Sequence, residues 1–372
     1  MSGDKLYLGL ISGTSADAID AVLAEFEPAT RLVAHYSHPW PPALRQRIVA
    51  MARAQASVTL DELGQLDALI GDQFALAANA LLDQAGVDRQ QVRAIGSHGQ
   101  TVCHRPRAEP PFTMQLGDPA RIAEQTGVDV IADFRRADMA AGGQGAPLLP
   151  ILHQALLASA DETRVVLNLG GIANITVLAP NQPVLGFDTG PANCLLDGWI
   201  ERQLEQSHDA NGAWAASGQV DEALLARCLG ESYFQLAPPK STGREQFNLD
   251  WLDLHLDGSA TAVDVQATLL ALTVRTIADS IKSSAPGTDA VIACGGGVHN
   301  QALMTSLRAA IAPARLETTA DHGIDPDFIE ATAFAWLARQ RLLELPGNLP
   351  DVTGASGPRV LGDITAAPSR SL

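Results

Sequence analysis

Residues 6–26 read LYLGLISGTSADAIDAVLAEF, two apolar runs separated by a short polar turn. The pattern predicts two β-strands joined as a hairpin. The turn, residues 12–15, holds one glycine and three hydroxyl side chains, and such a cluster of backbone N–H groups and hydroxyls suits a phosphate. An ordinary hairpin turn explains this stretch equally well, because these residue types are common in turns. No Gly-Lys-Ser/Thr follows, so the turn is not a Walker loop.

The same order of elements recurs in the second half of the chain. Residues 31–37 predict a third strand after the first hairpin. Residues 164–169 and 172–178 predict a second hairpin around Gly170 and Gly171, again followed by a third strand. We interpret the repeated strand–turn–strand–strand order as an internal duplication within an α/β chain.

The chain is long enough for two domains, since 372 residues exceed one ordinary core. We expect an N-terminal domain over residues 1–147 and a C-terminal domain over residues 148–345. Residues 346–372 are predicted to form a tail that packs on the surface or is loosely ordered. Long helices are expected over residues 60–82 and 264–282. Asp325 is expected to cap the last helix.

The composition excludes several classes of protein. The net charge is −17, and no cluster of Lys and Arg stands out, which argues against nucleic acid or an anionic membrane as a partner. The four cysteines form no Cys-x-x-Cys pair, so reduced thiols fit better than a metal cluster or disulfide framework. The N-terminal apolar run is too short for a signal peptide or a membrane span. We therefore expect a cytoplasmic protein, with a homodimer possible.

Three glycine turns each follow a predicted strand, at residues 12–15, 188–191 and 295–297. Together, in a duplicated chain, they indicate two phosphate loops that face each other and a third loop against a nucleoside. The motifs SGTSADAID, SHGQTVCHRP, DFRRADMAAGGQGAPLLP, LNLGGIANITVL, GFDTGPAN and GGGVHN resemble, in order, those of the anhydro-N-acetylmuramic acid kinases.

This resemblance spans nearly the whole chain and implies the two-domain fold of sugar kinases, Hsp70 and actin, which is ribonuclease H-like with an internal duplication. It also implies ATP-dependent opening of the 1,6-anhydro bridge of anhydro-N-acetylmuramic acid, giving the 6-phosphate in peptidoglycan recycling. Two positions depart from the family pattern, which usually has glycine where Ala18 and Ala192 stand. Neither change removes a reactive group.

The family motifs assign ATP, Mg²⁺ and the sugar to particular residues. Asp17 is the candidate for Mg²⁺, with Asp20 as an alternative, because magnesium favours one or two carboxylates plus phosphate oxygens. The residues assigned to ATP are Gly13, Thr14, Ser15, Ala16, Asp17, Ala18, Ile19, Asp20, Asn168, Gly170, Gly171, Gly190, Gly295, Gly296, Gly297 and Asn300. The residues assigned to the sugar are His98, Gln100, Thr101, Asp118, Arg135 and Glu330.

Asp188 is the candidate catalytic base, because it ends a strand just before a glycine turn. By resemblance it activates a water that attacks the anomeric carbon, while the freed O6 takes the γ-phosphoryl group. A helix cap or an Asx turn is the alternative interpretation. Arg135 can bind the lactyl carboxylate bidentately, but surface arginines are common. His98 can equally be a satisfied core histidine, and Glu330 a solvent-facing glutamate.

Two other functional classes serve as alternatives. A metal-dependent nucleotide-binding protein of the tRNA-modifying type needs a His-x-x-x-His pair, which the sequence lacks. A non-catalytic actin-like or Hsp70-like nucleotide-binding protein, or another sugar kinase of this fold, would give residues 96–136 a different role. Sugar-dependent release of ADP separates these possibilities.

Overall fold

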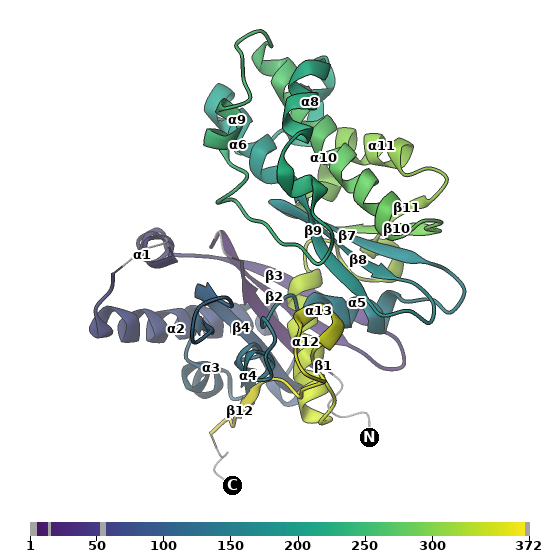
Figure 1. Ribbon diagram of the computed structural model, residues 1–372. Coiled ribbons are helices and arrows are strands. Elements are labelled where there is room, and N and C mark those ends of the chain that lie inside the picture. Colours follow the sequence, from purple (N-terminus) through teal and green to yellow (C-terminus); the bar gives the residue numbers. More distant parts are fainter. Residues whose placement is uncertain (1–5, 14–15, 53–56, 369–372) are drawn as a thin grey trace. The chain divides into compact units, whose positions relative to one another are not determined.

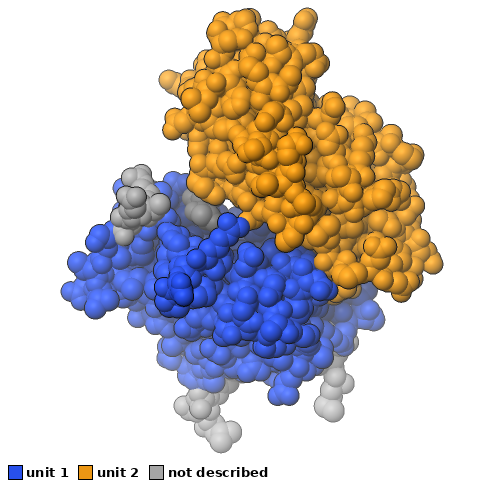
Figure 2. Space-filling view, viewed as in Figure 1, with its two compact units in different colours: residues 1–152, 328–372 blue, residues 153–327 orange. Residues whose placement is uncertain are grey.

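The computed structural model describes residues 6–13, 16–52 and 57–368. The chain forms two compact units (Figures 1 and 2). Unit 1 comprises Met1–Leu152 and Phe328–Leu372, and unit 2 comprises His153–Asp327.

Unit 1 is built on a mixed sheet that starts from the predicted hairpin. In the described residues the sheet has seven strands in the order β12-β6-β4-β1-β2-β3, with β5 paired to β4. β1, β2 and β3 are antiparallel neighbours, whereas β4 and β6 run parallel to β1. The strands are β1 Leu6–Ser12, β2 Ala18–Glu25, β3 Arg31–Pro39, β4 Val92–Arg105, β5 Phe112–Leu116, β6 Val130–Ala132 and β12 Asp363–Thr365.

The two faces of this sheet are covered by different helices. Side chains of α2 (Leu60–Ala85) pack with Leu8 and Leu10 of β1 in one apolar cluster. Alternate residues of a strand point to opposite faces, and Gly9 between these leucines faces α12 (Ile329–Leu342). A Cβ at Gly9 or at Gly96 of β4 would overlap backbone atoms of α12. Glycine is therefore required at both positions for the helix to approach the sheet this closely.

The C-terminal segment returns to unit 1 and is tied to it. The buried carboxylate of Asp138 accepts hydrogen bonds from Asn348 Nδ2 and Thr353 Oγ1, both at 2.6 Å, and from Gly145 N at 2.7 Å. β12 then pairs antiparallel with β6. Phe328–Leu372 therefore belongs to the same unit as the N-terminal part of the chain. The domain boundaries expected from the sequence were at residues 147 and 345.

Unit 2 repeats the strand order of unit 1. In the described residues its sheet has five strands in the order β11-β10-β7-β8-β9. β7, β8 and β9 are antiparallel neighbours, and β10 and β11 run parallel to β7. The strands are β7 Arg164–Leu169, β8 Ile172–Leu178, β9 Leu185–Pro191, β10 Ala290–Cys294 and β11 Arg315–Thr318. The predicted α/β class is confirmed, and the recurrence of the strand order in both units is the expected result of an internal duplication.

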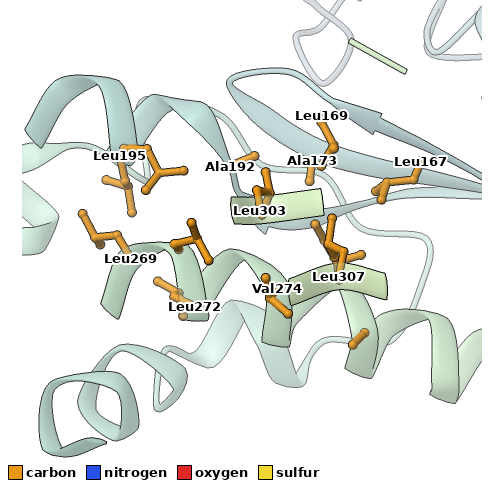
Figure 3. Close-up of a cluster of buried hydrophobic side chains, with 14 of the residues drawn as sticks. Leu167, Leu169, Ala173, Ala192, Leu195, Leu269, Leu272, Val274, Leu303 and Leu307 are labelled. Atoms are coloured by element: carbon orange, nitrogen blue, oxygen red, sulfur yellow. The ribbon is translucent and has the colours of Figure 1, made fainter. Parts of the chain in front are cut away.

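The core of unit 2 lies between its sheet and two helices. Leu167, Leu169 and Ala173 of the β7–β8 hairpin face apolar side chains of α10 (Ala262–Ser284) and α11 (Gln301–Ala310), as Figure 3 shows. This packing fixes the positions of the loops at the ends of β7 and β10.

The remaining helices are short. They are α1 Pro42–Ala52, α3 Pro119–Thr126, α4 Arg136–Ala140, α5 Leu149–Leu157, α6 Asn193–Leu204, α7 Ala213–Ser217, α8 Glu222–Leu229, α9 Leu249–Asp253 and α13 Pro350–Thr353. One prediction was wrong: α12 begins at Ile329 without a side-chain cap, while the Asp325 carboxylate accepts a hydrogen bond from Asp327 N. Within the described part of the chain, no helix combines the length and apolar character needed to cross a membrane.

Candidate active site

The predicted first phosphate loop is the turn between β1 and β2 in unit 1. Thr14 and Ser15 lie outside the described residues. Ala16 is buried, has a left-handed backbone (φ 50°) and donates its N–H to Gly13 O at 3.0 Å. Arg45 of α1 donates to Ala16 O at 2.8 Å. Hydrogen bonds through both the N–H and the carbonyl of Ala16 therefore hold the described part of the turn in place.

The two carboxylates that follow this turn have different surroundings. The exposed Asp17 forms an ion pair with Arg45 at 2.9 Å. Asp20 lies on β2 and accepts a hydrogen bond from Ser37 Oγ at 2.6 Å. Burial raises the pKa of Glu330 on α12, and the charge of Asp20 adds to this shift. Ala18 and Ile19, between Asp17 and Asp20, are the first residues of β2.

His98, Arg135 and Glu330 form one cluster in unit 1. His98 is buried on β4, and its Nδ1 lies 2.9 Å from Gly99 O. Arg135 Nε donates to His98 Nε2 at 3.0 Å, so the ring carries its proton on Nδ1. Arg135 also donates to Gly145 O at 2.9 Å. His98 is thus a satisfied buried histidine that orients the guanidinium.

Burial sets the charge states in this cluster. It lowers the pKa of His98 well below its usual value, with a further contribution from the Arg135 cation. It lowers the pKa of Arg135 to about 10, an effect that Glu330 opposes. Burial also raises the pKa of Glu330, as does Asp20, whereas Arg135 lowers it. His98 is therefore neutral near pH 7, and Arg135 is cationic.

Two side chains near this cluster keep buried polar atoms without hydrogen-bond partners among the described residues. They are Gln100 Oε1 and Ser97 Oγ, both on β4. The amide nitrogen of Gln100 donates to Gly13 O at 3.1 Å, which links β4 to the first loop. A buried unpaired acceptor is costly unless a ligand or water satisfies it, so these atoms suit a hydroxyl-bearing ligand.

The other two residues assigned to the sugar have local partners. Thr101 Oγ1 accepts a hydrogen bond from Gln115 Nε2 at 3.2 Å across the β4–β5 pair. Asp118 caps the N-terminus of α3, where it accepts from Ala120 N at 2.8 Å. This cap is sufficient to explain an aspartate at position 118.

In unit 2, Asp188 lies on β9 and is braced by a distant segment of the chain. Its Oδ2 accepts a hydrogen bond from Thr242 N at 3.0 Å. Its backbone N–H donates to Lys240 O at 3.2 Å, and its carbonyl accepts from Tyr233 Oη at 2.7 Å. The carboxylate therefore neither caps a helix nor closes an Asx turn. Burial raises the pKa of Asp188 to about 6, which Thr242 opposes and Glu245 reinforces.

Three loops of unit 2 pack together at the ends of β7, β9 and β10. Asn193 at the start of α6 donates from Nδ2 to Leu169 O at 3.0 Å and from its backbone to Gly170 O at 3.1 Å. A Cβ at Gly295 would lie 2.5 Å from Asn168 Oδ1, and one at Gly297 would lie 2.6 Å from Leu169 Cβ. The structure thus brings together the unit 2 residues assigned to ATP. These are Asn168, Gly170, Gly171, Gly190, Gly295, Gly296, Gly297 and Asn300.

A cavity of about 490 Å³ opens beside these loops. It is lined by Gly296, Gly297 and Asn300, together with Asp197 of α6 and His208. Burial raises the pKa of Asp197 to about 6, and His208 opposes this shift. The cavity has the size and mixed polarity of a small-molecule site.

Similarity to known proteins identifies the family of this chain. A model of the family described as anhydro-N-acetylmuramic acid kinase matches residues 5–367. The chain belongs to the anhydro-N-acetylmuramic acid kinase family. The predicted family is therefore confirmed.

Relatives that carry the family name match the chain from end to end. The anhydro-N-acetylmuramic acid kinase of Xanthomonas campestris pv. campestris is 54% identical over 97% of both chains. That of Xylella fastidiosa is 52% identical over 97% of this chain and 96% of its own. That of Coxiella burnetii is 47% identical over 96% of each.

Solved structures that resemble the chain are more distant. The activator of 2-hydroxyisocaproyl-CoA dehydratase from Clostridium difficile with bound ADPNP is 12% identical, covers 91% of this chain and 98% of its own, and has a TM-score of 0.44. A ROK family glucokinase from Streptomyces griseus in complex with glucose and AMPPNP is 14% identical, covers 90% of this chain and 99% of its own, and has a TM-score of 0.40.

The sequence analysis missed the segment that braces Asp188. Residues 236–247, LAPPKSTGREQF, show no clear helical or strand period. Two signals were available: the consecutive prolines, which exclude a helix, and the sequence Ser-Thr-Gly-Arg, which combines hydroxyls, a glycine and a cation.

Proposed function

We propose that this protein is an ATP-dependent kinase that opens the 1,6-anhydro bridge of 1,6-anhydro-N-acetylmuramic acid and phosphorylates O6. The product is N-acetylmuramic acid 6-phosphate. The observation that carries this proposal is the family match over residues 5–367, together with relatives that are 47–54% identical over nearly their whole length.

In this proposal Asp188 is the general base. Its carboxylate takes a proton from water as the water oxygen bonds to C1, and the C1–O6 bond breaks. O6 then forms a bond with the γ-phosphorus of ATP, while the bond to the ADP oxygen breaks. The raised pKa of Asp188, about 6, supports this role, because a base works best when its pKa lies near the working pH.

Unit 1 is assigned the binding of the sugar acid. Arg135 is held by His98 and Gly145 through Nε and one terminal nitrogen, and its guanidinium has further donors for the lactyl carboxylate. A neutral His98 keeps this guanidinium oriented without adding a second positive charge. The unpaired Gln100 Oε1 supports a role as an acceptor for a sugar hydroxyl or amide.

ATP is assigned to the glycine loops of unit 2 and to the first turn of unit 1. Mg²⁺ would enter with ATP, and when bound it would neutralise phosphate charge. Asp17 and Asp20 are its candidate carboxylates; Asp17 is paired with Arg45, and Asp20 accepts a hydrogen bond from Ser37. In the described residues no group of three or more potential metal ligands occurs, which fits a metal held largely by phosphate oxygens.

The proposal is tested by turnover of ATP and anhydro-N-acetylmuramic acid in ¹⁸O-water. The product is expected to carry one ¹⁸O at C1 and none in the phosphoryl group. Asp188→Asn keeps the size of the side chain and an acceptor for Thr242 N, but cannot take a proton, so turnover should fall by about 10²–10⁴-fold.

Three results would reject parts of the proposal. Label in the phosphate would mean simple hydrolysis of ATP, and release of ADP that does not depend on the sugar would favour a nucleotide-binding protein without a sugar substrate. Full activity of Asp188→Asn would remove the base from the mechanism. A cytoplasmic location and a homodimer remain predictions from the sequence.

A further inference from the structure

One segment of unit 2 contacts both the proposed base and the glycine turn between β7 and β8. Thr242 N donates to Asp188 Oδ2, and Lys240 O accepts from Asp188 N. Two residues beyond Thr242, the side chain of Arg244 reaches the turn between β7 and β8. The segment 240–244 therefore joins two parts of the candidate site that are distant in sequence.

Arg244 lies directly against Gly171. A Cβ built at Gly171 would be 3.0 Å from Arg244 Nη2, 3.1 Å from Nε and 3.4 Å from Cζ. All three atoms belong to the guanidinium group, so the charged end of Arg244, and not its aliphatic part, covers the backbone of this loop. Glycine at position 171 leaves room for that approach.

The charge of Arg244 has no acidic partner among the ion pairs of the described residues. Other arginines of unit 2 are neutralised: Arg202 by Asp253, Arg227 by Asp257 and Arg275 by Asp279. Arg244 is exposed. Burial raises the pKa values of the nearby Cys194 and Asp197, and the Arg244 cation opposes both shifts.

Lys240, the other cation of this segment, is already engaged. Its ammonium group donates to Tyr233 O at 3.2 Å and to Phe234 O at 3.4 Å. It also lies over the Tyr233 ring, 4.7 Å from the centroid. Lys240 therefore secures the segment, and Arg244 is left as the cation that faces the loop.

We propose that Arg244 is a catalytic residue that binds the phosphoryl group transferred from ATP. This inference rests on the proposed function. The guanidinium presents a planar fork of donors that matches phosphate oxygens. As O6 bonds to phosphorus and the bond to ADP breaks, negative charge spreads over the equatorial oxygens, where these donors stabilise it.

The position of segment 240–244 also links base catalysis at C1 to phosphoryl transfer to O6. The N–H that holds the Asp188 carboxylate and the guanidinium on Gly171 belong to residues that are separated only by Gly243. A shift of this segment would move both groups together. The same segment therefore positions the base for attack at C1 and the cation for transfer to O6.

The first test is nucleotide binding, which needs no turnover. The dissociation constants of ADP and of a non-hydrolysable ATP analogue are measured by calorimetry for the wild type and for Arg244→Ala. If Arg244 contacts the γ-phosphoryl group, the wild type binds the analogue more tightly than ADP. The ratio of the dissociation constant of ADP to that of the analogue should then fall at least tenfold in Arg244→Ala. An unchanged preference would overturn the proposal.

The second test is kinetic and includes a conservative variant. Arg244→Ala should lower kcat by about 10²–10³-fold, the usual effect of removing one donor that stabilises developing charge. Added guanidinium ion should restore part of that rate, and Arg244→Lys should be intermediate, since it keeps the charge but loses the fork. Arg275→Ala, which removes an exposed arginine paired with Asp279, is the control and should keep wild-type kcat.

The outcomes separate this inference from the proposed function. A wild-type protein without sugar-dependent ADP release would reject the proposed function, while the binding comparison would still decide the role of Arg244. A kcat of Arg244→Ala within threefold of wild type, or an equal loss in the control Arg275→Ala, would overturn the role of Arg244.

Discussion

Burial shifts the pKa values of basic and acidic groups in opposite directions. In unit 1 it lowers the pKa values of His98 and Arg135, whereas in unit 2 it raises that of Asp188. In each case the uncharged form is favoured, because a charge loses solvation when it is buried. His98 is left neutral at physiological pH, and Asp188 becomes a base that titrates close to the working range.

The first prediction at the residue scale concerns pH. With a pKa of about 6, Asp188 is deprotonated above that pH and protonated below it. The value of kcat/KM for the sugar, at saturating ATP, should therefore be flat above pH 7. It should fall by about tenfold per pH unit below pH 6, since only the deprotonated base is active.

Asp197 needs a control, because burial raises its pKa to about 6 as well. Asp197→Asn should keep the acid limb of the profile if Asp188 is the group that titrates. Loss of the limb in Asp197→Asn, or a limb that persists in the residual activity of Asp188→Asn, would assign the titration elsewhere.

The second prediction separates two neighbouring arginines. Arg135 is half-buried and hydrogen-bonded to His98 and Gly145, whereas Arg136 is exposed and paired with Asp133. Arg135→Ala should weaken binding of the sugar acid by at least tenfold and change ATP affinity little. Arg136→Ala should leave both affinities unchanged. Calorimetry with each ligand measures this, and thermal unfolding checks that both variants fold. Equal losses for both ligands in Arg135→Ala would contradict the assignment.

Among the elements, α12 has the most demanding contact. Its backbone lies against Gly9 of β1 and Gly96 of β4, with no room for a Cβ at either position. Its side chains are buried around most of its circumference, including Phe334 and Leu337. A helix that is apolar all round must be covered on every side, which explains why the C-terminal segment folds back over unit 1.

The third prediction tests this contact with two Gly→Ala substitutions that are expected to change the free energy of unfolding in opposite directions. Gly96→Ala should destabilise the protein by about 1–3 kcal/mol or more, because the new methyl group overlaps the backbone of α12. Gly64→Ala lies on an exposed turn of α2 with nothing within 4 Å, and should stabilise it by about 0.5–1 kcal/mol. Urea unfolding, followed by circular dichroism, measures both. A neutral Gly96→Ala would mean that the helix is not held this close.

Periodicity and turn chemistry predicted most elements within a few residues. The hairpin β1–β2, the helices α2 and α10, and the repeat β7–β8 all rest on local patterns that span a single element. β5 and β12 were missed, since each is short and is defined by its partner strand. The cap expected at Asp325 was wrong, because the chain makes a local turn at Asp327 before α12 begins.

The candidate site was predictable only in part, for a similar reason. The glycines at 170–171 and 295–297 follow strands, so their position at the ends of strands could be inferred. The turn predicted at residues 188–191 was wrong, because these residues continue β9 and Asp188 pairs with Asn174 of β8. Thr242 lies 54 positions beyond Asp188 and bonds back to it, Arg244 reaches back to Gly171, and no local pattern encodes such returns. The interaction of His98 with Arg135 is long-range in the same way.

In the molecule as a whole, the two units share a strand order but not a chain organisation. Unit 2 is one continuous segment with its own sheet and core. Unit 1 is made of two segments, and the second supplies α12 and the partners of Asp138. The two units therefore share a strand order, but unit 2 is built from one segment of the chain and unit 1 needs two.

The fourth prediction follows from this difference. Residues 153–327 expressed alone should fold and unfold cooperatively, since their core needs no other segment. Residues 1–152 alone should not, because the sheet face at Gly9 and Gly96 and the Asp138 carboxylate lose their cover. Near-UV circular dichroism and thermal unfolding of the two fragments measure this. Cooperative unfolding of residues 1–152 would show that α12 is dispensable.

The discontinuity of unit 1 also has a consequence for protein synthesis. A ribosome adds about 5–20 residues per second, so the 175 residues of unit 2 take on the order of ten to thirty seconds to emerge after Leu152. Throughout that interval the nascent N-terminal segment carries an uncovered apolar sheet face. The growing chain is then a natural client for ribosome-associated chaperones, and slow translation of residues 153–327 would lengthen its exposure to aggregation.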